Sequence, residues 1–158
     1  GALTIMCGGE EQAFEEARKV MKLYSKFSIR MGESGTGQLT KMVNQICISG
    51  LIQSLAEGIN FSENAGLDTK KVIEVISKGA AQSWQMDNRW KTMLEDEYDH
   101  GFAVDWMIKD LGFIKKEASL NNSTIEITNL VLSFYEEIKD KGGGKFDTSS
   151  LLRRIQEK

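Results

Sequence analysis

The spacing of apolar residues predicts a short strand–helix–strand segment followed by a long helix. Residues 3–7 form a short apolar run and residues 27–31 a second candidate strand, and between them residues 10–22 carry apolar side chains at helical spacing. From Thr36 to about Ala65 apolar residues occupy most positions around a helix. A helix of about 30 residues is ~45 Å long. We therefore predict that this helix is the central element and that other helices pack around it.

Shorter helices are predicted along the rest of the chain, between residues that commonly end or cap helices. The long helix ends at Gly66, and the last helix begins after Asp147. Between them, a helix capped by Asp68 or Thr69 is predicted to end at Gly79, and an aromatic segment over 84–94 follows. A helix is then predicted over 103–120. Another helix, capped by Ser123 or Thr124 with Glu126 completing a capping box, reaches Lys141 and is followed by a flexible break at Gly142–Gly144.

These elements predict a mainly α protein of two parts. Residues 1–32 resemble the end of a Rossmann-type α/β domain, and residues 33–158 are expected to form an all-α domain. Two strands alone do not make a stable sheet, so we expect the first part to need further strands.

Composition excludes several classes of function. The net charge of −3 and the dispersed basic residues argue against a nucleic-acid partner. No apolar stretch reaches the roughly 18 residues of a membrane span, and we expect a cytoplasmic protein without a membrane partner. One histidine and two cysteines provide neither a multi-histidine metal site nor a disulfide framework, so no metal is expected.

The segment Gly32–Gln45 carries the most informative chemistry. It contains Gly32, Gly35 and Gly37, and the predicted helix that follows presents Lys41, Asn44 and Gln45 on one face. An ammonium and two amides beside a glycine-rich loop are suited to holding and protonating a small oxygenated substrate. A glycine-rich turn followed by a surface lysine is the simpler alternative.

A phosphate-binding loop is another alternative for the same segment. Gly32 and Gly37 have the G-x-x-x-x-G spacing of such a loop. The pattern then requires Lys and Ser or Thr, whereas this chain has Gln38 and Leu39. The lysine and hydroxyl that would hold phosphates and magnesium are missing, so we do not expect ATP binding.

The motif Gly-x-x-Gly-x-Gly-x-x-x-Lys-x-x-Asn-Gln at 32–45 resembles the catalytic-lysine motif of the β-hydroxyacid dehydrogenases, which include 3-hydroxyisobutyrate dehydrogenase and tartronate, glyoxylate and succinic semialdehyde reductases. Three further stretches resemble the family in order and spacing. They are a strand ending in Gly-Gly at 3–9, Phe-x6-Lys-Asp-Leu at 102–111, and Gly-x-Gly-x-x-Asp-x-Ser at 142–149.

The resemblance implies an NAD(P)-dependent oxidoreductase that transfers a hydride between nicotinamide and a small 3-hydroxyacid or semialdehyde. Lys41 would be the general acid/base, favoured by a helix N-terminus that disfavours its charged form. Gly37, Asn44 and Gln45 would bind the substrate, and Gln45 replaces the family's more frequent Asn. Phe102, Lys109 and Asp110 would lie on the cofactor side.

The resemblance also implies what this chain lacks. The G-x-G-x-x-G fingerprint of dinucleotide binding is not present. We therefore interpret the chain as a C-terminal portion: a 6-phosphogluconate dehydrogenase C-terminal-like all-α substrate-binding domain that dimerises. NAD or NADP would be bound mainly by a missing N-terminal domain, and the fragment alone would be inactive. The alternative is a non-enzymatic helical module for oligomerisation or binding.

Overall fold

The computed structural model describes residues 2–157 and divides into two compact units, residues 1–44 and 45–158. Helix α2 (Thr36–Asn64) runs through the boundary between them. The predicted domain division at residue 32 concerns the family architecture and stays a prediction. Each unit is described by itself.

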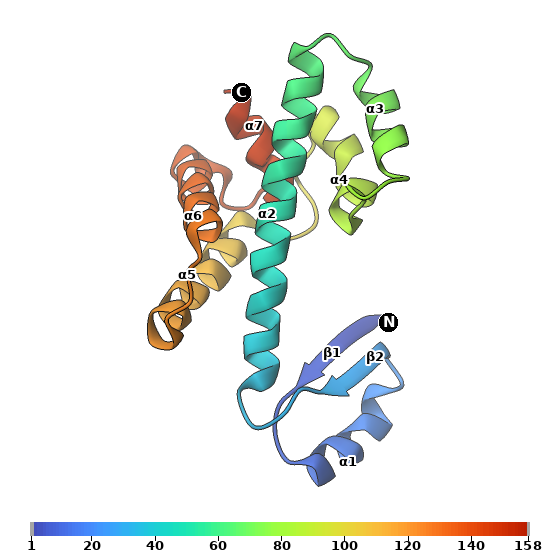
Figure 1. Cartoon of the computed structure of the whole chain (residues 1–158), viewed down its shortest axis with the longest axis vertical. Helices are drawn as coiled ribbons and strands as arrows, with labels where there is room; N and C mark the ends of the chain where they lie inside the picture. The colour runs from blue at the N-terminus through green and yellow to red at the C-terminus, as the bar shows by residue number, and fades with distance from the viewer. Residues whose placement is uncertain (1, 158) are drawn as a thin grey trace. The chain divides into compact units, whose positions relative to one another are not determined.

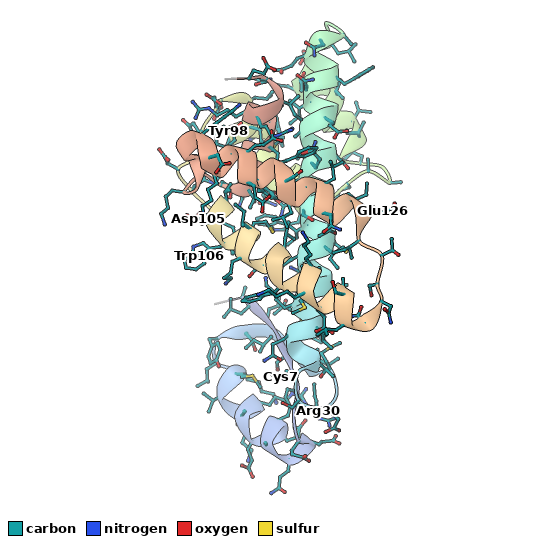
Figure 2. All side chains as sticks on the ribbon, turned by 90° about the vertical axis from the view of Figure 1, so that its left-hand side faces the viewer. Cys7, Arg30, Tyr98, Asp105, Trp106 and Glu126 are labelled. Carbon is teal, nitrogen blue, oxygen red and sulfur yellow. The ribbon has the colours of Figure 1, made fainter. Side chains whose placement is uncertain are left out.

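The first unit is built on two parallel strands. Strands β1 (Leu3–Cys7) and β2 (Ser25–Arg30) pair from Thr4↔Phe27 to Cys7↔Arg30, and helix α1 (Glu11–Met21) connects them (Figure 1). Met21 is the buried residue of α1, and the Cys7 Sγ lies 3.9 Å from its Sδ. The Arg30 Nε donates to the Gly9 carbonyl at 2.6 Å, which ties the ends of the two strands together (Figure 2). The strand–helix–strand prediction is confirmed.

The second unit is helical. It contains the remainder of α2 together with α3 (Thr69–Ile76), α4 (Trp84–Leu94), α5 (Val104–Asn121), α6 (Glu126–Ile138), a π-helical turn (Lys139–Gly143), a 3-10 turn (Thr148–Ser150) and α7 (Leu151–Ile155). Helices α5 and α6 lie on one side of α2, and α3 and α4 on the other (Figure 1). Fully buried apolar side chains from these elements, such as Ile52, Ile59, Leu111 and Tyr135, form the core.

Several predicted helix ends agree with the structure, whereas α3 ends at Ile76 rather than at Gly79 and the start of α6 is not capped as predicted. The Asp68 side chain accepts from the Lys71 amide at 3.2 Å, Gly66 has φ +70°, and Asp147 caps the 3-10 turn. The prediction of a capping box before α6 is wrong, because the N-cap residue of α6 is Ile125 and no side chain caps the helix.

The glycine segment 142–144 is packed rather than a flexible break. Gly142 adopts φ +88°, which favours glycine, and Gly143 is buried. A Cβ on Gly143 would lie 2.6 Å from Ile138 Cγ2 and 2.7 Å from Phe146 Cδ2. The glycines therefore allow a close turn after α6.

The predicted fold class, an all-α domain of the 6-phosphogluconate dehydrogenase C-terminal type preceded by a Rossmann remnant, needs correction. The chain is not all-α, because the paired strands and α1 form a compact unit that also includes the first turns of α2. Helical periodicity located α2 correctly, but it carried no information on how the first turns of α2 group with the strands.

Within residues 2–157, no helix is long and apolar enough to cross a membrane. Among the same residues, no group of three or more His, Cys, Asp or Glu side chains is arranged to hold a metal ion.

Candidate active site

Lys41 lines a hollow in the first unit. The hollow has a volume of about 520 Å³ and is bounded by residues 3–8 of β1 and its end, by Gly37 and Gln38, and by Lys41. Lys41 lies in the second turn of α2 and is exposed to solvent. The chemistry predicted for Lys41 needs access to a small molecule, and this position provides it.

Two glycines allow the start of α2 to lie directly against the end of β1. A Cβ on Gly37 would lie 2.5 Å from the Met6 carbonyl oxygen and 3.0 Å from the Gly8 nitrogen. A Cβ on Gly8 would lie 2.5 Å from the Glu33 carbonyl oxygen. Any side chain at either position would push the helix and the strand apart. Gly37 therefore shapes the wall of the hollow, and its contact with substrate stays a prediction.

The first turn of α2 is fixed by a threonine. The Thr36 hydroxyl and amide both donate to the Glu33 carbonyl, at 2.7 Å and 3.1 Å. Lys41 follows five residues later, and Asn44 three residues after that, on the same helical face. Both Lys41 and Asn44 are exposed. Their side chains can therefore approach one bound molecule from the same helix.

In the second unit, three of the predicted site residues form one network. Gln45 is buried, and its Nε2 donates to Asp110 Oδ2 at 2.8 Å. The other carboxylate oxygen of Asp110 lies 3.3 Å from Lys109 Nζ. Asp110 thus joins a residue assigned to substrate and a residue assigned to cofactor. Hydrogen bonds to an ionised carboxylate are stronger than neutral ones, so this network orients both side chains.

An exposed tryptophan completes the surface beside Lys109. The Lys109 Nζ lies 5.1 Å from the centre of the Trp106 ring, within the range of a cation–π contact. Trp106 projects from α5 and is 53% exposed (Figure 2). Asp105 lies four residues before Lys109 on α5, but its Oδ1 pairs with Lys139 Nζ at 3.0 Å instead. Trp106 was not assigned to the site from the sequence.

Phe102 is held by a buried carboxylate. The Phe102 amide donates to Asp147 Oδ2 at 2.8 Å, and the other carboxylate oxygen receives Arg89 Nε at 3.1 Å. The Ser149 amide and hydroxyl donate to Asp147 as well, at 3.1 Å and 2.6 Å. Gly101 has φ +70°, and a Cβ there would collide with Asp147 Oδ2. Asp147 therefore fixes the loop that leads into α5.

Arg89 is a residue that sequence reasoning missed. It lies 58 residues before Asp147 and carries no motif. Only its place on α4, where its guanidinium also lies 5.0 Å from the Trp84 ring centre, brings it to the carboxylate. No signal in the sequence links the two residues.

A buried tyrosine lies close to this carboxylate. The Tyr135 hydroxyl donates to the Thr148 carbonyl at 3.2 Å. Burial raises the pKa of Tyr135 well above its usual value, and the charge of Asp147 acts in the same direction. Tyr135 therefore remains a neutral hydrogen-bond donor.

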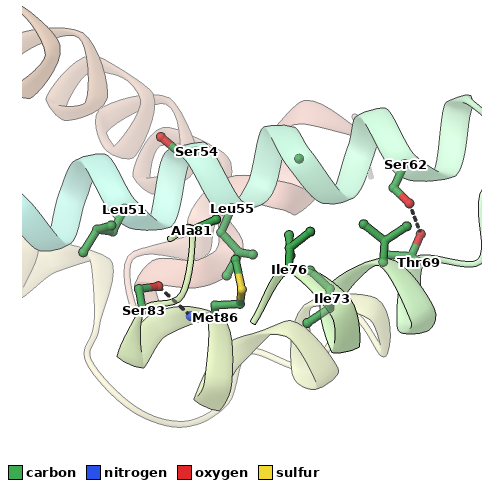
Figure 3. Close-up of a pocket in the computed structure, with 12 residues that line it drawn as sticks. Leu51, Ser54, Leu55, Ser62, Thr69, Ile73, Ile76, Ala81, Ser83 and Met86 are labelled. Atoms are coloured by element: carbon green, nitrogen blue, oxygen red, sulfur yellow. Dashed lines mark hydrogen bonds between the residues drawn. The ribbon is translucent and has the colours of Figure 1, made fainter. Parts of the chain in front are cut away.

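A second hollow of about 280 Å³ lies between α2, α3 and α4 (Figure 3). Its lining is largely apolar and includes Leu55, Ile73 and Met86. The Ser62 and Thr69 hydroxyls at its edge are hydrogen-bonded to each other at 2.9 Å. None of the site residues predicted from the sequence lines it, so we assign it no role.

The structure thus divides the predicted site residues between the two units. The first unit contains Gly37, Lys41 and Asn44, and the second contains Gln45, Phe102, Lys109 and Asp110. Gln45, Lys109 and Asp110 are brought together in the second unit, and Lys41 lines the hollow in the first.

Comparison with known proteins identifies the family. A family model described as NAD-binding of NADP-dependent 3-hydroxyisobutyrate dehydrogenase matches residues 35–155. An uncharacterized oxidoreductase of Shewanella frigidimarina is 55% identical over 156 residues, which is 99% of this chain and 54% of that protein. A probable 3-hydroxyisobutyrate dehydrogenase-like protein of Arabidopsis thaliana is 35% identical over 99% of this chain and 46% of that protein.

A solved structure shows the same fold. The crystal structure of 3-hydroxyisobutyrate dehydrogenase from Salmonella typhimurium aligns with a TM-score of 0.86 at 25% identity. The alignment covers 96% of this chain and 54% of that one. The chain therefore spans about half the length of the relatives it matches.

These comparisons confirm the family resemblance, and they also contradict the predicted fold class. The matched region, residues 35–155, is described as NAD-binding. That description does not agree with a substrate domain of the 6-phosphogluconate dehydrogenase C-terminal type. The matched region contains Lys41 as well as the Gln45–Asp110–Lys109 network. We conclude that the chain belongs to the family described as NAD-binding of NADP-dependent 3-hydroxyisobutyrate dehydrogenase.

Proposed function

We propose that the chain is part of an NAD(P)-dependent dehydrogenase that acts on a small 3-hydroxyacid or the corresponding semialdehyde. The observation that carries this proposal is the position of Lys41, which lines an open hollow at the start of α2 in a chain of this family. The names of the relatives from Arabidopsis thaliana and Salmonella typhimurium support the same class of substrate.

Lys41 acts as the general acid/base in this proposal. Its amine gives a proton to the carbonyl oxygen of the semialdehyde during reduction and takes it from the hydroxyl during oxidation. The position of Lys41 in the second turn of α2 places its side chain at the hollow beside the end of β1. The hollow beside it admits a small substrate.

Asn44 and Gln45 have different parts in the proposal. Asn44 is exposed on the same helical face as Lys41 and would donate its amide to the substrate hydroxyl or carboxylate. Gln45 is buried and held by Asp110, which supports a role in orienting its neighbours. Its direct contact with substrate stays a prediction.

The residues of the second unit fit one end of a nicotinamide dinucleotide. Lys109 supplies a cation for phosphate or ribose oxygens, and the exposed Trp106 ring beside it supplies a stacking surface. Asp110 keeps Lys109 in place through the 3.3 Å ion pair, and Phe102 is positioned by Asp147. When bound, the dinucleotide supplies or accepts the hydride. The choice between NAD and NADP is left open.

The experiment that tests the proposal is Lys41→Ala in the protein with all segments that its relatives have. We expect kcat to fall on the order of 1,000-fold while cofactor binding is retained. Lys70→Ala, at an exposed position on α3, is the matched control and should keep full activity. Equal turnover by the two variants would reject a catalytic Lys41 and favour the non-enzymatic binding module.

The proposal also covers the length of chain and the oligomeric state that activity requires. The chain spans about half the length of its relatives, so we propose activity for the longer protein and expect none from the 158-residue chain alone. We also propose a homo-oligomer, because α2, α5 and α6 expose large apolar side chains such as Phe61, Leu120 and Ile127. Sedimentation velocity of the longer protein tests this directly, and a monomer would reject it.

A further inference from the structure

A small hollow lies near the C-terminal end of the second unit. Its volume is about 160 Å³. The residues that line it are Ile138, Lys141, Gly143, Phe146, Ser150, Arg153 and Arg154. None of the residues assigned to substrate or cofactor is among them, so the hollow is separate from the candidate active site.

Among the described residues that line this hollow, three side chains are cationic and none is acidic. Arg154 uses Nε and Nη2 for a bidentate pair with Glu137, at 2.7 Å and 3.1 Å. Arg153 Nη2 lies 3.8 Å from Asp96, beyond hydrogen-bond distance. A guanidinium has five N–H donors, so both arginines keep donors beyond these contacts. With Lys141, the hollow has a net positive charge.

A buried hydroxyl lies at the same hollow without a hydrogen-bond partner in the structure. Ser150 is fully buried, and its Oγ has neither a donor nor an acceptor within reach. An unsatisfied buried hydroxyl costs about as much free energy as a lost hydrogen bond, so such groups are rare unless a water or ligand completes them. The Ser150 hydroxyl can donate to an oxygen atom bound in the hollow.

The apolar side of the hollow holds one of the arginines in position. The Arg153 guanidinium lies 5.2 Å from the centre of the Phe146 ring. Gly143 is packed between Ile138 and Phe146, which leaves no room for a side chain there. The shape of the hollow is therefore set by the packed turn after α6.

From these observations we propose that this hollow binds an oxyanion, the phosphate or carboxylate group of a small molecule. The anion accepts hydrogen bonds from Arg153 and Arg154 and from the Ser150 hydroxyl, and Lys141 adds a further positive charge. A volume of about 160 Å³ accommodates several water molecules at roughly 30 Å³ each, which is enough for a phosphate or a short carboxylate. We expect a dissociation constant on the order of 1 mM.

Calorimetric titration of the 158-residue chain tests the proposal. Inorganic phosphate and propionate are titrated separately, with sodium chloride at equal ionic strength as the reference, because exposed charges respond to salt alone. We expect saturable binding of at least one oxyanion. Phosphate alone indicates a phosphate-bearing ligand, propionate alone indicates a carboxylic acid, and binding of both indicates recognition of the shared oxyanion geometry.

Two variants test the residues. Arg153→Gln leaves a neutral polar side chain in place of the guanidinium and should weaken binding about tenfold. Ser150→Ala should weaken it about fivefold. Arg18→Gln removes the same kind of charge from an exposed pair with Glu15 in the first unit and should leave binding unchanged. Ser150→Ala keeps the test decisive if Arg153→Gln does not fold.

No saturable binding of either oxyanion would overturn the proposal. Binding of equal strength by the wild-type chain and both variants would do so as well, since it would place the anion elsewhere. The titration measures no turnover, and Ser150 and Arg153 line this hollow rather than the one beside Lys41, so loss of binding in their variants can be told apart from failure of the proposed dehydrogenase activity.

Discussion

Replacing Asp147 with alanine removes the acceptor at the centre of the second unit. The Asp147 carboxylate is fully buried and receives Arg89 Nε, the Phe102 amide, and the Ser149 amide and hydroxyl at 2.6–3.1 Å. The variant leaves all four donors without this partner, and the guanidinium of Arg89 becomes a largely buried unpaired charge. Loss of one partner of a buried pair costs 3–5 kcal/mol, so we expect a loss of about 4 kcal/mol.

The measurement is urea unfolding followed by tryptophan fluorescence. Trp84, Trp90 and Trp106 all lie in the second unit, so the signal reports the unit that contains Asp147. With a slope of about 2 kcal/mol per molar urea, a loss of about 4 kcal/mol moves the midpoint by roughly 2 M. Since a domain is stable by about 5–15 kcal/mol in total, this is a large share.

Two further variants separate the loss of the Asp147 charge from the effect of removing any surface aspartate. Asp147→Asn keeps an acceptor oxygen for Phe102 or Ser149 but loses the charge, and we expect an intermediate loss of about 2 kcal/mol. Asp99→Ala makes the same chemical change at an exposed position and should cost less than about 0.5 kcal/mol. A loss below about 1 kcal/mol for Asp147→Ala would show that the carboxylate does not hold the loop before α5.

Two other predictions follow from the packing. Gly37→Ala should destabilise the first unit by about 2 kcal/mol, because its Cβ would lie 2.5 Å from the Met6 carbonyl oxygen. Gly50→Ala, in the part of α2 that belongs to the second unit, meets no atom within 4 Å and should stabilise the helix by about 0.5–1 kcal/mol. Faster hydrogen exchange of β1 is expected in the Gly37 variant only, and unchanged exchange there would contradict the close contact. Burial raises the pKa of Tyr135, so its hydroxyl ionises in the unfolded chain before it does so in the folded one. The free energy of unfolding of the wild-type chain should therefore fall as pH rises above 10, and Tyr135→Phe should flatten this part of the stability profile. Identical stability profiles for the two proteins above pH 10 would contradict a neutral buried tyrosine.

The candidate site was partly readable from the sequence. The spacing of Lys41 and Asn44 and the glycines before them indicated one face of α2, and the family motif indicated Lys109 and Phe102; the roles of these residues stay predictions. The sequence did not show that Asp110 joins Gln45 to Lys109, nor that Trp106 lies beside Lys109. These contacts depend on where α5 packs against α2, which spacing along either helix does not determine.

What the sequence determined by itself was local. The strand at Leu3–Cys7 was predicted with its observed bounds, and α2 was predicted to within one residue at its end. Asp147 was identified as a cap, and Asp68 was one of two candidates for the cap of α3. Such features depend on hydrogen bonds and side-chain spacing within a few residues, so the order of residues is sufficient.

Only the tertiary structure decided how distant segments meet. It grouped the first turns of α2 with the strand pair, paired Asp147 with Arg89 from 58 residues away, and packed the expected glycine break into a close turn at Gly143. Contacts of this kind form because the assembled elements bring the groups together and exclude water from them. Their free energy belongs to the packed arrangement, and no short stretch of the sequence contains it.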